Sequence, residues 1–264
     1  MIEELTRVPE IEAQIASAVE SIRLGRPCYA FDEIGSTMDA AHRFAADGAP
    51  EGTVIWSERQ TAGRGRSGRL WVSPRGGLYL SIILRPSRDY TELPQLALLG
   101  GLAAAQAIHA LTNLPARVRW PNDVLLQDQK LVGVLTELTT DRGGARYAVV
   151  GVGINVTIPA DELPPGATTL SRWVAVAPDR VVLAAAWLRA LDHAYLCWSA
   201  EGFAPLRTGL VQWSGVFGKI VHITTPKDRF GGQAMDIDEQ GRLLVRLDSG
   251  MMRAVDMGEV ALLR

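Results

Sequence analysis

Apolar and polar residues follow two different periods along this chain. Apolar positions three or four residues apart predict helices, while alternation or short apolar runs bounded by turn residues predict strands. The helical period covers residues 4–22, 38–46, 94–111, 179–200 and 203–212. Within the first 214 residues, strand-like runs cover residues 29–34, 54–57, 77–85, 117–126, 130–138 and 146–156. The pattern therefore predicts helices and strands mixed along the chain.

The links between the later strands are short. Residues 127–129 and 141–144 are rich in turn formers, and loops of this length join antiparallel neighbours, whereas parallel neighbours need long crossovers. We therefore expect an α+β fold with a mixed, mainly antiparallel sheet and helices on one side. Gly100 and Gly101 lie inside the helix predicted over 94–111, where each costs about 1 kcal/mol relative to alanine. Their presence indicates a close packing contact there.

The pattern changes near Gly215. From Lys219 onward, short alternating segments are separated by turns, and they cover residues 220–224, 232–237, 243–247 and 252–256. Such spacing predicts a small all-β module of the barrel kind. We therefore divide the chain into an N-terminal helical extension (1–27), a main domain (28–214) and a C-terminal β-domain (215–264).

Composition and charge exclude several classes of protein. Apolar residues make up 47% of the chain, and 27 Lys and Arg nearly balance 29 Asp and Glu. No apolar run approaches the length of a bilayer span, and the first residues are acidic, so we expect neither a membrane anchor nor a secretory signal. The two cysteines and four histidines show no spacing typical of a metal or redox site. We therefore expect a cytoplasmic protein. An exposed edge of the sheet could pair two chains as a homodimer.

Positive charge is concentrated in one segment. Residues 59–75, named here the arginine loop, hold five arginines and no acidic residue. Glycines let a backbone turn its N–H groups toward an anion, and guanidinium groups bind phosphate or carboxylate through two hydrogen bonds. A solvated turn, a nucleic-acid contact and a phosphate clamp in an enzyme all fit this segment. Trp71, which can stack on a purine, and the nearly neutral total charge favour the enzyme.

Two further segments carry candidate chemistry. Pro121-Asn122-Asp123 is a turn signal, but its side-chain oxygens can also hold Mg²⁺, and Lys130 follows on the next strand. Residues 149–156 contain Gly151 and Gly153 but lack the third glycine and the helix of a dinucleotide-binding fingerprint. These glycines indicate instead that a ligand or another backbone comes close to the strand.

Together these segments resemble the biotin–protein ligases. The similarity rests on three motifs in the same order and with similar gaps, and it runs from about residue 30 to the C-terminus. The motifs are Gly63-Arg64-Gly65-Arg66-Ser67-Gly68-Arg69-Leu70-Trp71, Arg119-Trp120-Pro121-Asn122-Asp123 with Lys130-Leu131-Val132-Gly133, and Gly151-Val152-Gly153-Ile154-Asn155. The resemblance implies the class II synthetase-like fold of the lipoate and biotin ligases, followed by an SH3-like β-barrel.

The resemblance also implies a reaction and its residues. Biotin would react with ATP and Mg²⁺ to give biotinyl-5′-AMP, and would then pass to a lysine of the biotin carboxyl carrier protein of acetyl-CoA carboxylase or a related carboxylase. Lys130, Arg66 and Asp123 would be catalytic, with Asp123 as the Mg²⁺ ligand. Biotin or the adenylate would contact Ser36, Thr37, Gln60, Arg64, Gly65, Arg66, Lys130 and Gly133. The nucleotide would contact Arg69, Trp71, Asn122 and Asn155, with Trp71 on the adenine.

The chain departs from the family pattern at several positions. Met38 stands where asparagine is usual, and Arg119 stands where lysine is common. The N-terminus lacks the DNA-binding domain of the bifunctional members, so we expect ligase activity without binding of operator DNA.

Two alternative functions remain open. One alternative is a lipoate or octanoate ligase or transferase of the same fold, which labelled lipoate would detect. The other is a nucleic-acid-binding regulator, whose affinity would fall steeply with salt.

Overall fold

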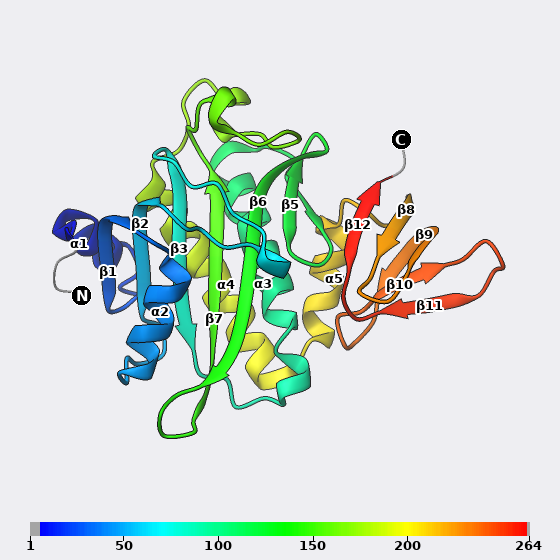
Figure 1. Cartoon of the computed structure of the whole chain (residues 1–264), viewed down its shortest axis with the longest axis horizontal. Coiled ribbons are helices and arrows are strands. Elements are labelled where there is room, and N and C mark those ends of the chain that lie inside the picture. The colour runs from blue at the N-terminus through cyan, green and yellow to red at the C-terminus, as the bar shows by residue number, and fades with distance from the viewer. Residues whose placement is uncertain (1–5, 263–264) are drawn as a thin grey trace.

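A seven-stranded mixed sheet forms the centre of the molecule (Figure 1). The computed structural model describes residues 6–262. The strands lie in the order β1-β2-β3-β7-β6-β5-β4. Their bounds are β1 Cys28–Ile34, β2 Val54–Gln60, β3 Gly77–Leu84, β4 Arg117–Arg119, β5 Asp123–Leu126, β6 Gln129–Thr140 and β7 Arg146–Asn155.

Strand directions follow from the lengths of the connections. β1 and β2 run parallel, and each other pair of neighbours in this sheet runs antiparallel. Helix α2 (Thr37–Ala46) joins the parallel pair and carries the chain back to the end of the sheet where β1 began, whereas a short turn joins β6 to β7. The predicted mixed, mainly antiparallel sheet is confirmed.

The strand-like run of residues 117–126 does not continue as one strand, because it divides at Pro121 and Asn122, where the sequence carries a turn signal. The chain reverses at Pro121 and Asn122, so that Arg119 pairs with Asp123 in a hairpin of β4 and β5. Proline has no N–H to donate to a ladder, and asparagine is common in turns, so these two residues interrupt the strand. The reversal brings Asp123 opposite Gly133 of β6.

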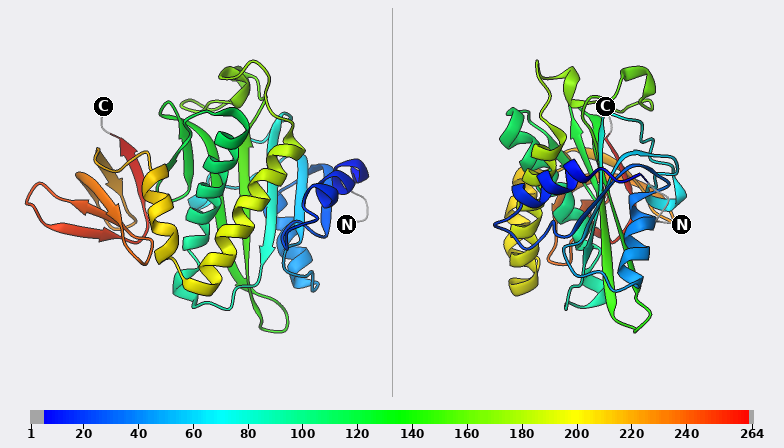
Figure 2. Two further views of the ribbon diagram at one scale, coloured as in Figure 1. Left: turned by 180° about the vertical axis from the view of Figure 1, so that it is seen from behind. Right: turned by 90° about the vertical axis from the view of Figure 1, so that its left-hand side faces the viewer.

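Helices cover both faces of the sheet (Figure 2). On one face α3 (Gln95–Thr112) packs with α4 (Arg180–Glu201), and α4 also contacts α1 (Pro9–Ala18) and α5 (Ala204–Trp213). On the opposite face, Met38 and Ala41 of α2 belong to a separate apolar cluster with Ile55 and Ile83. The expectation of helices on one side is therefore corrected. Alternate residues of β2 and β3 point to this second face and need their own cover.

Helix α3 lies in the larger core. By length and composition its 18 residues could cross a bilayer, which the sequence prediction overlooked, but 67% of this span is buried inside the protein. A Cβ atom on Gly100 would lie 2.9 Å from Val134 Cγ1, and the Gly100 carbonyl accepts a 3.0 Å hydrogen bond from Trp187 Nε1. The predicted close contact is confirmed at Gly100, whereas a Cβ on Gly101 would have an ordinary contact of 3.8 Å with Val118 Cγ1.

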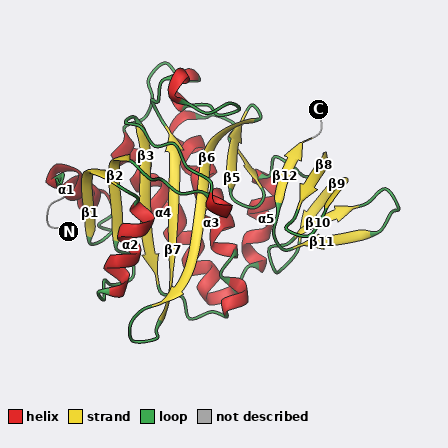
Figure 3. Cartoon of the chain, viewed as in Figure 1, coloured by secondary structure: helices red, strands yellow, loops and turns green. Residues whose placement is uncertain are grey.

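The C-terminal β-domain is a second, antiparallel sheet of five strands, ordered β11-β10-β9-β8-β12 (Figure 3). The bounds are β8 Ile220–Thr224, β9 Arg229–Ile237, β10 Leu243–Arg246, β11 Met252–Val255 and β12 Glu259–Leu262. The sequence pattern missed β12, whereas it located β10 and β11. In the part of the chain that is described, no pairing joins β11 to β12, so the predicted SH3-like barrel is not confirmed.

The two sheets share one hydrophobic core. Val221 and Ile223 of β8 belong to the same buried cluster as Leu96 of α3 and Trp120. The buried Trp120 also donates a 3.0 Å hydrogen bond from Nε1 to the carbonyl of Gly241. The motif around Pro121 is therefore anchored to the second sheet. The division of the chain into three domains remains a prediction.

The edges of the main sheet already have backbone partners within the chain. At β1, Val8 N donates to Ala30 O and Asp32 N donates to Thr6 O, both at 2.9 Å. At β4, Gly215 N donates to Val118 O at 2.8 Å.

The first helix is shorter than predicted, since it begins at Pro9 and ends at Ala18. Residues 4 and 5 of the prediction lie outside the described residues.

The two adjacent glycines of α3 allow a matched test of core packing. Gly100→Ala should lower the free energy of unfolding by about 1–3 kcal/mol, because its methyl group would displace Val134. Gly101→Ala should leave it unchanged or raise it by up to about 1 kcal/mol, because alanine favours the helix and has room. Urea unfolding followed by circular dichroism measures both. Equal effects of the two substitutions would contradict the packing described here.

Candidate active site

The arginine loop folds back on itself and is ordered by its own backbone. Gln60 N donates to Ser73 O at 3.1 Å, and Trp71 N donates to Gly63 O at 2.9 Å, so the two arms of the loop run side by side. A Cβ atom on Gly63 would lie 2.5 Å from Ser73 Oγ. Glycine at this position therefore allows the arms to approach.

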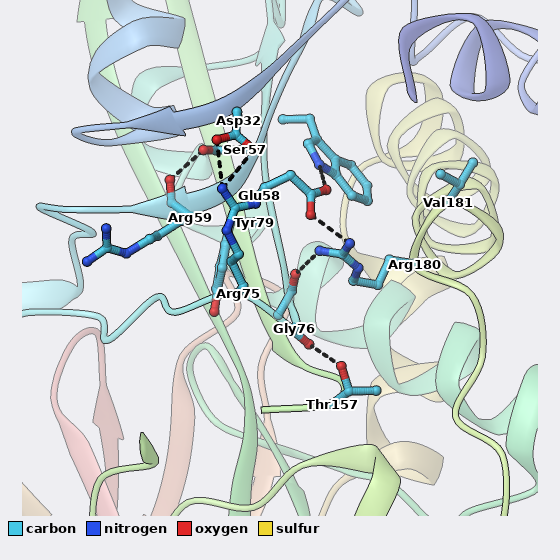
Figure 4. Close-up of polar contacts among 12 residues, drawn as sticks. Asp32, Ser57, Glu58, Arg59, Arg75, Gly76, Tyr79, Thr157, Arg180 and Val181 are labelled. Atoms are coloured by element: carbon cyan, nitrogen blue, oxygen red, sulfur yellow. Dashed lines mark hydrogen bonds and ion pairs between the residues drawn. The ribbon is translucent and has the colours of Figure 1, made fainter. Parts of the chain in front are cut away.

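The second arm is fixed where it enters β3. Arg75 donates two hydrogen bonds to the carboxylate of Asp32, at 2.8 and 2.7 Å, and these hold the pKa of Asp32 below its ordinary value. Thr157 Oγ1 donates to the carbonyl of Gly76 at 3.3 Å (Figure 4). Gly76 has a φ of +96°, which favours glycine. The loop therefore begins and ends at fixed points on the sheet.

Trp71 lies flat against the sheet beneath the loop. A Cβ atom on Gly133 of β6 would lie 2.8 Å from Trp71 Cζ3, and one on Gly153 of β7 would lie 2.5 Å from Trp71 Cε2. Gly133 and Gly153 are paired across the two strands, so together they make a gap that an indole ring fills. The close approach predicted at Gly151 and Gly153 is made by side chains, the indole of Trp71 at Gly153 and Met38 at Gly151, rather than by another backbone or a ligand.

The loop and the sheet enclose a cavity of about 400 Å³. Eleven of the residues predicted for the site line it, and they come from four separate parts of the chain. These residues are Thr37, Gln60, Arg64, Gly65, Arg66, Arg69, Trp71, Asn122, Asp123, Lys130 and Gly133. The fold thus gathers most of the three motifs around one space.

Two predicted residues do not line the cavity. Ser36 is buried at the N-terminus of α2, where its side chain makes no capping hydrogen bond. Asn155 is buried at the end of β7 and donates a 2.9 Å hydrogen bond from Nδ2 to Thr168 O. Asn155 therefore holds a neighbouring segment rather than facing the space directly.

One end of the cavity is charged. Lys130 Nζ lies 2.7 Å from Asp123 Oδ1, and Arg119 Nη2 donates to Asp123 Oδ2 at 2.6 Å. Lys130 Nζ also lies 5.3 Å from the centre of the Trp71 ring, within the range of a cation–π contact. The carboxylate and the indole thus fix the ammonium group at the cavity wall.

The arginines of the loop differ in the groups that their side chains contact. Four of the five pair with carboxylates, namely Arg59 with Glu33, Arg64 with Glu137, Arg69 with Glu259 and Arg75 with Asp32. Arg66 instead donates to Asn122 Oδ1 and Gly258 O, each at 3.1 Å, and no described carboxylate lies within ion-pair distance of it. Burial lowers the pKa of Arg66, although a guanidinium remains charged at neutral pH. Arg66 is therefore the arginine best placed to bind an anion.

A chain of hydrogen bonds crosses the other end of the cavity. Ser81 Oγ donates to Thr37 Oγ1 at 2.8 Å, and Thr37 Oγ1 donates to Gln60 Oε1 at 3.0 Å. Gln60 Nε2 then donates to Ser73 Oγ at 2.9 Å, and Ser73 donates to the carbonyl of Trp71. Ser73 and Ser81 were missed in the sequence because a single serine in a loop or strand carries no pattern.

Two more segments at the cavity were not predicted. Gly166 O accepts from Lys130 N at 2.8 Å, and Thr168 N donates to Lys130 O at 2.9 Å, so residues 166–168 pair with the start of β6. From the second sheet, Glu259 and Val260 of β12 also line the cavity. These contacts join segments that are far apart in sequence, and no local signal indicates them.

The predicted Mg²⁺ site at Asp123 does not fit the residues around it. Both carboxylate oxygens of Asp123 are already in ion pairs, with Arg119 and Lys130. Over residues 6–262 there is no group of three His, Cys, Asp or Glu side chains that could hold a metal ion. The protein alone therefore offers no cage for Mg²⁺, which prefers six oxygen ligands.

Comparison with known families and proteins gives a consistent result. Residues 30–155 match the Biotin/lipoate A/B protein ligase family, and residues 216–263 match the Biotin protein ligase C terminal domain. The chain is 35% identical to the Biotin--[acetyl-CoA-carboxylase] ligase of Mycobacterium tuberculosis over 247 residues, which cover 88% of this chain and 87% of that protein. It is 34% identical to the Bifunctional ligase/repressor BirA of Escherichia coli, over 85% of this chain and 72% of that protein.

Solved structures agree with this similarity. The biotin protein ligase of Aquifex aeolicus, solved in complex with biotin and ATP, has 30% sequence identity to this chain and superposes with a TM-score of 0.78. The match covers 90% of this chain and 98% of that one. It therefore includes both sheets.

A methyl group on the cavity floor should release the loop. Gly153→Ala cannot coexist with the present position of Trp71, so trypsin should cut at the loop arginines at least about tenfold faster as the indole moves away. Gly35→Ala is the matched control, since its Cβ would meet no atom within 4 Å. Mass spectrometry of timed digests measures the cleavage. Equal rates in Gly153→Ala and the parent protein would show that Trp71 does not anchor the loop.

Proposed function

The chain belongs to the biotin protein ligase family, and we propose that the cavity beneath the arginine loop is where it joins biotin to AMP. In the first step, the carboxylate of biotin attacks the α-phosphorus of ATP, which forms biotinyl-5′-AMP and releases pyrophosphate. In the second step, the amine of a carrier lysine attacks the acyl carbon, and AMP leaves. The partner is a carboxylase with a biotin carrier domain.

The charged end of the cavity suits the first step. A carboxylate must approach a phosphate, and negative charge increases on the phosphoryl oxygens as the bond forms, so fixed positive groups lower the barrier. Arg66 has no carboxylate partner among the described residues, and Lys130 is held between Asp123 and Trp71. We assign Arg66 and Lys130 to bind the reacting oxygens. Asp123 positions Lys130 and Arg119 and so supports the reaction without holding a metal.

The walls of the cavity suit the two parts of the adenylate. At the charged end Trp71 offers a ring face for adenine, and Arg69 and Asn122 lie beside it. At the other end, Thr37 and Gln60 provide polar atoms, and Met38 and Val134 provide apolar surface for the rings of biotin. A mixed anhydride is destroyed by water, so the loop that covers the cavity would also protect the product.

Mg²⁺ enters this proposal with the nucleotide. It keeps several water ligands and binds phosphate oxygens readily, so ATP would supply the ligands that the protein does not. When bound, it would neutralise charge on the phosphates.

Asn155 would act on the site indirectly. Its side chain donates to Thr168 O, in the segment that pairs with Lys130.

Other parts of the proposal concern the protein in the cell. Names of relatives point to acetyl-CoA carboxylase as the source of the carrier domain. ATP as a substrate and two free cysteines, Cys28 and Cys197, support a cytoplasmic location. Absence of DNA binding, closure of the C-terminal barrel and a homodimer through a sheet edge remain predictions. A dimer of that kind would use parts of β1 or β4 other than those paired within the chain.

The observation that carries the proposal is the placement of Arg66 and Lys130 at one end of a single cavity. Arg66→Met and Lys130→Met should each lower biotin-dependent ATP–pyrophosphate exchange by at least about 100-fold, since each removes a charge at the reacting oxygens. Thermal unfolding midpoints should stay within a few degrees of the parent value.

Arg59→Met is the matched control for these variants. Arg59 belongs to the same loop, but it pairs with Glu33 on the surface and does not line the cavity, so exchange should change less than about twofold. Full exchange in both Arg66→Met and Lys130→Met would remove the site assignment. Exchange supported by lipoate and not by biotin would identify the related lipoate ligase activity instead.

A further inference from the structure

Arg64, in the first arm of the arginine loop, is tied to two elements outside the loop. Its Nη2 lies 2.7 Å from Glu137 Oε2 and 3.0 Å from Asp39 Oδ1. Asp39 lies in the first turn of α2, and Glu137 lies in β6. One guanidinium group therefore connects the loop, the helix and the sheet at the entrance to the cavity.

A histidine holds the acceptor from its other side. His42 Nε2 lies 2.8 Å from the same Oε2 atom of Glu137 that Arg64 contacts. His42 Nδ1 lies 3.2 Å from the hydroxyl group of Tyr147 in β7, so the imidazole ring is itself fixed at both nitrogens. His42 follows Asp39 by three residues on α2, which places both side chains on the same face of the helix. Glu137 is thus held in position to accept from Arg64.

This cluster differs from the other ion pairs of the loop. Arg59 and Arg75 each pair with one carboxylate, and the side chains of Glu33 and Asp32 are both 43% exposed. Glu137 is 29% exposed and has two basic partners. Exposed single ion pairs contribute little to the free energy of folding, and Asp39 is itself 47% exposed. Glu137 is the less exposed centre of the network, and its two partners define its geometry better.

The charges around Arg64 also argue against a direct hold on the ligand. Two carboxylates lie against one guanidinium group, so the positive charge of Arg64 is already compensated and is not left for an anionic adenylate. Arg66, two residues further along, has the opposite surroundings, with carbonyl oxygens as acceptors and no ion pair to any residue that the structure describes. The two arginines of the first arm therefore have different tasks.

We propose that Asp39, His42 and Glu137 form a latch that holds the arginine loop closed through Arg64 and so keeps the acyl-adenylate on the protein. These three are positioning residues, and Arg64 is given a holding role in place of the ligand contact implied by family resemblance. The proposal rests on the proposed function, because only a bound, water-sensitive intermediate needs such a cover. The latch acts on the lifetime of the intermediate rather than on its formation.

A double-mutant cycle tests the latch in the full-length protein. The variants are Arg64→Met, Glu137→Gln and the two combined. Each protein is loaded with biotin and labelled ATP, excess unlabelled ATP is added, and the labelled adenylate that remains bound is followed by rapid desalting. Each single variant should shorten the bound lifetime about tenfold, and the combined variant should shorten it no further, because both lose one shared interaction. The kcat of pyrophosphate exchange should change less than about threefold.

Further variants separate the latch from a general loss of structure. His42→Gln keeps an N–H donor for Glu137 and should lose less lifetime than His42→Ala. Asp39→Asn provides a second way to weaken the hold on Arg64 if Glu137→Gln proves unstable in thermal unfolding. Glu33→Gln removes the partner of Arg59 at an exposed pair and should leave both the lifetime and exchange unchanged.

The outcomes distinguish failure of the latch from failure of the proposed function. If the effects of Arg64→Met and Glu137→Gln multiply in the combined variant, Arg64 acts on the ligand independently and the latch is wrong. Unchanged lifetimes in every variant also overturn it while the ligase activity stands. If the parent protein forms no labelled adenylate from biotin and ATP, the proposed function itself has failed.

Discussion

Charge compensation is the constraint on which the site depends. Five guanidinium groups within residues 59–75 would repel one another if they were all free. Acids from β1, β6 and β12 pair with four of them, and α2 adds another carboxylate at Arg64. These ion pairs connect the folded loop to the elements around it. What remains is the half-buried Arg66, for which no carboxylate of residues 6–262 lies within ion-pair distance.

The floor of the site follows from a second constraint, the spacing of strands in a sheet. Side chains at paired positions of β6 and β7 would normally fill the space above the backbone. Because Gly133 and Gly153 face each other there, the indole of Trp71 can lie directly on the strands. The ring then supports Lys130 from one side while Asp123 supports it from the other. Backbone geometry thus decides where the ammonium group lies.

The second sheet also helps to position the arginine loop and the charged end of the cavity. Gly258 supplies a carbonyl oxygen to Arg66, and Glu259 pairs with Arg69, so the tip of the arginine loop rests on β12. Trp120, just before Pro121, donates to Gly241 in the turn between β9 and β10 of this sheet. A shift of the C-terminal β-domain would therefore move both the loop and the charged end of the cavity. The shared hydrophobic core joins the two sheets as well.

The sequence by itself determined most of the elements and the chemistry of the site. Periodicity located the helices at 37–46, 95–112 and 180–201 to within one residue at their starts, and the motifs named eleven residues that line one cavity. These are local signals, since periodicity, glycine content and charge density act over a few residues. Only the tertiary structure decided that α2 covers the opposite face, that Arg119 pairs with Asp123 across a hairpin, and that both carboxylate oxygens of Asp123 lie in ion pairs with Arg119 and Lys130. The pairing of Arg64 with Glu137 joins residues 73 positions apart, and such contacts depend on how the sheet brings distant segments together.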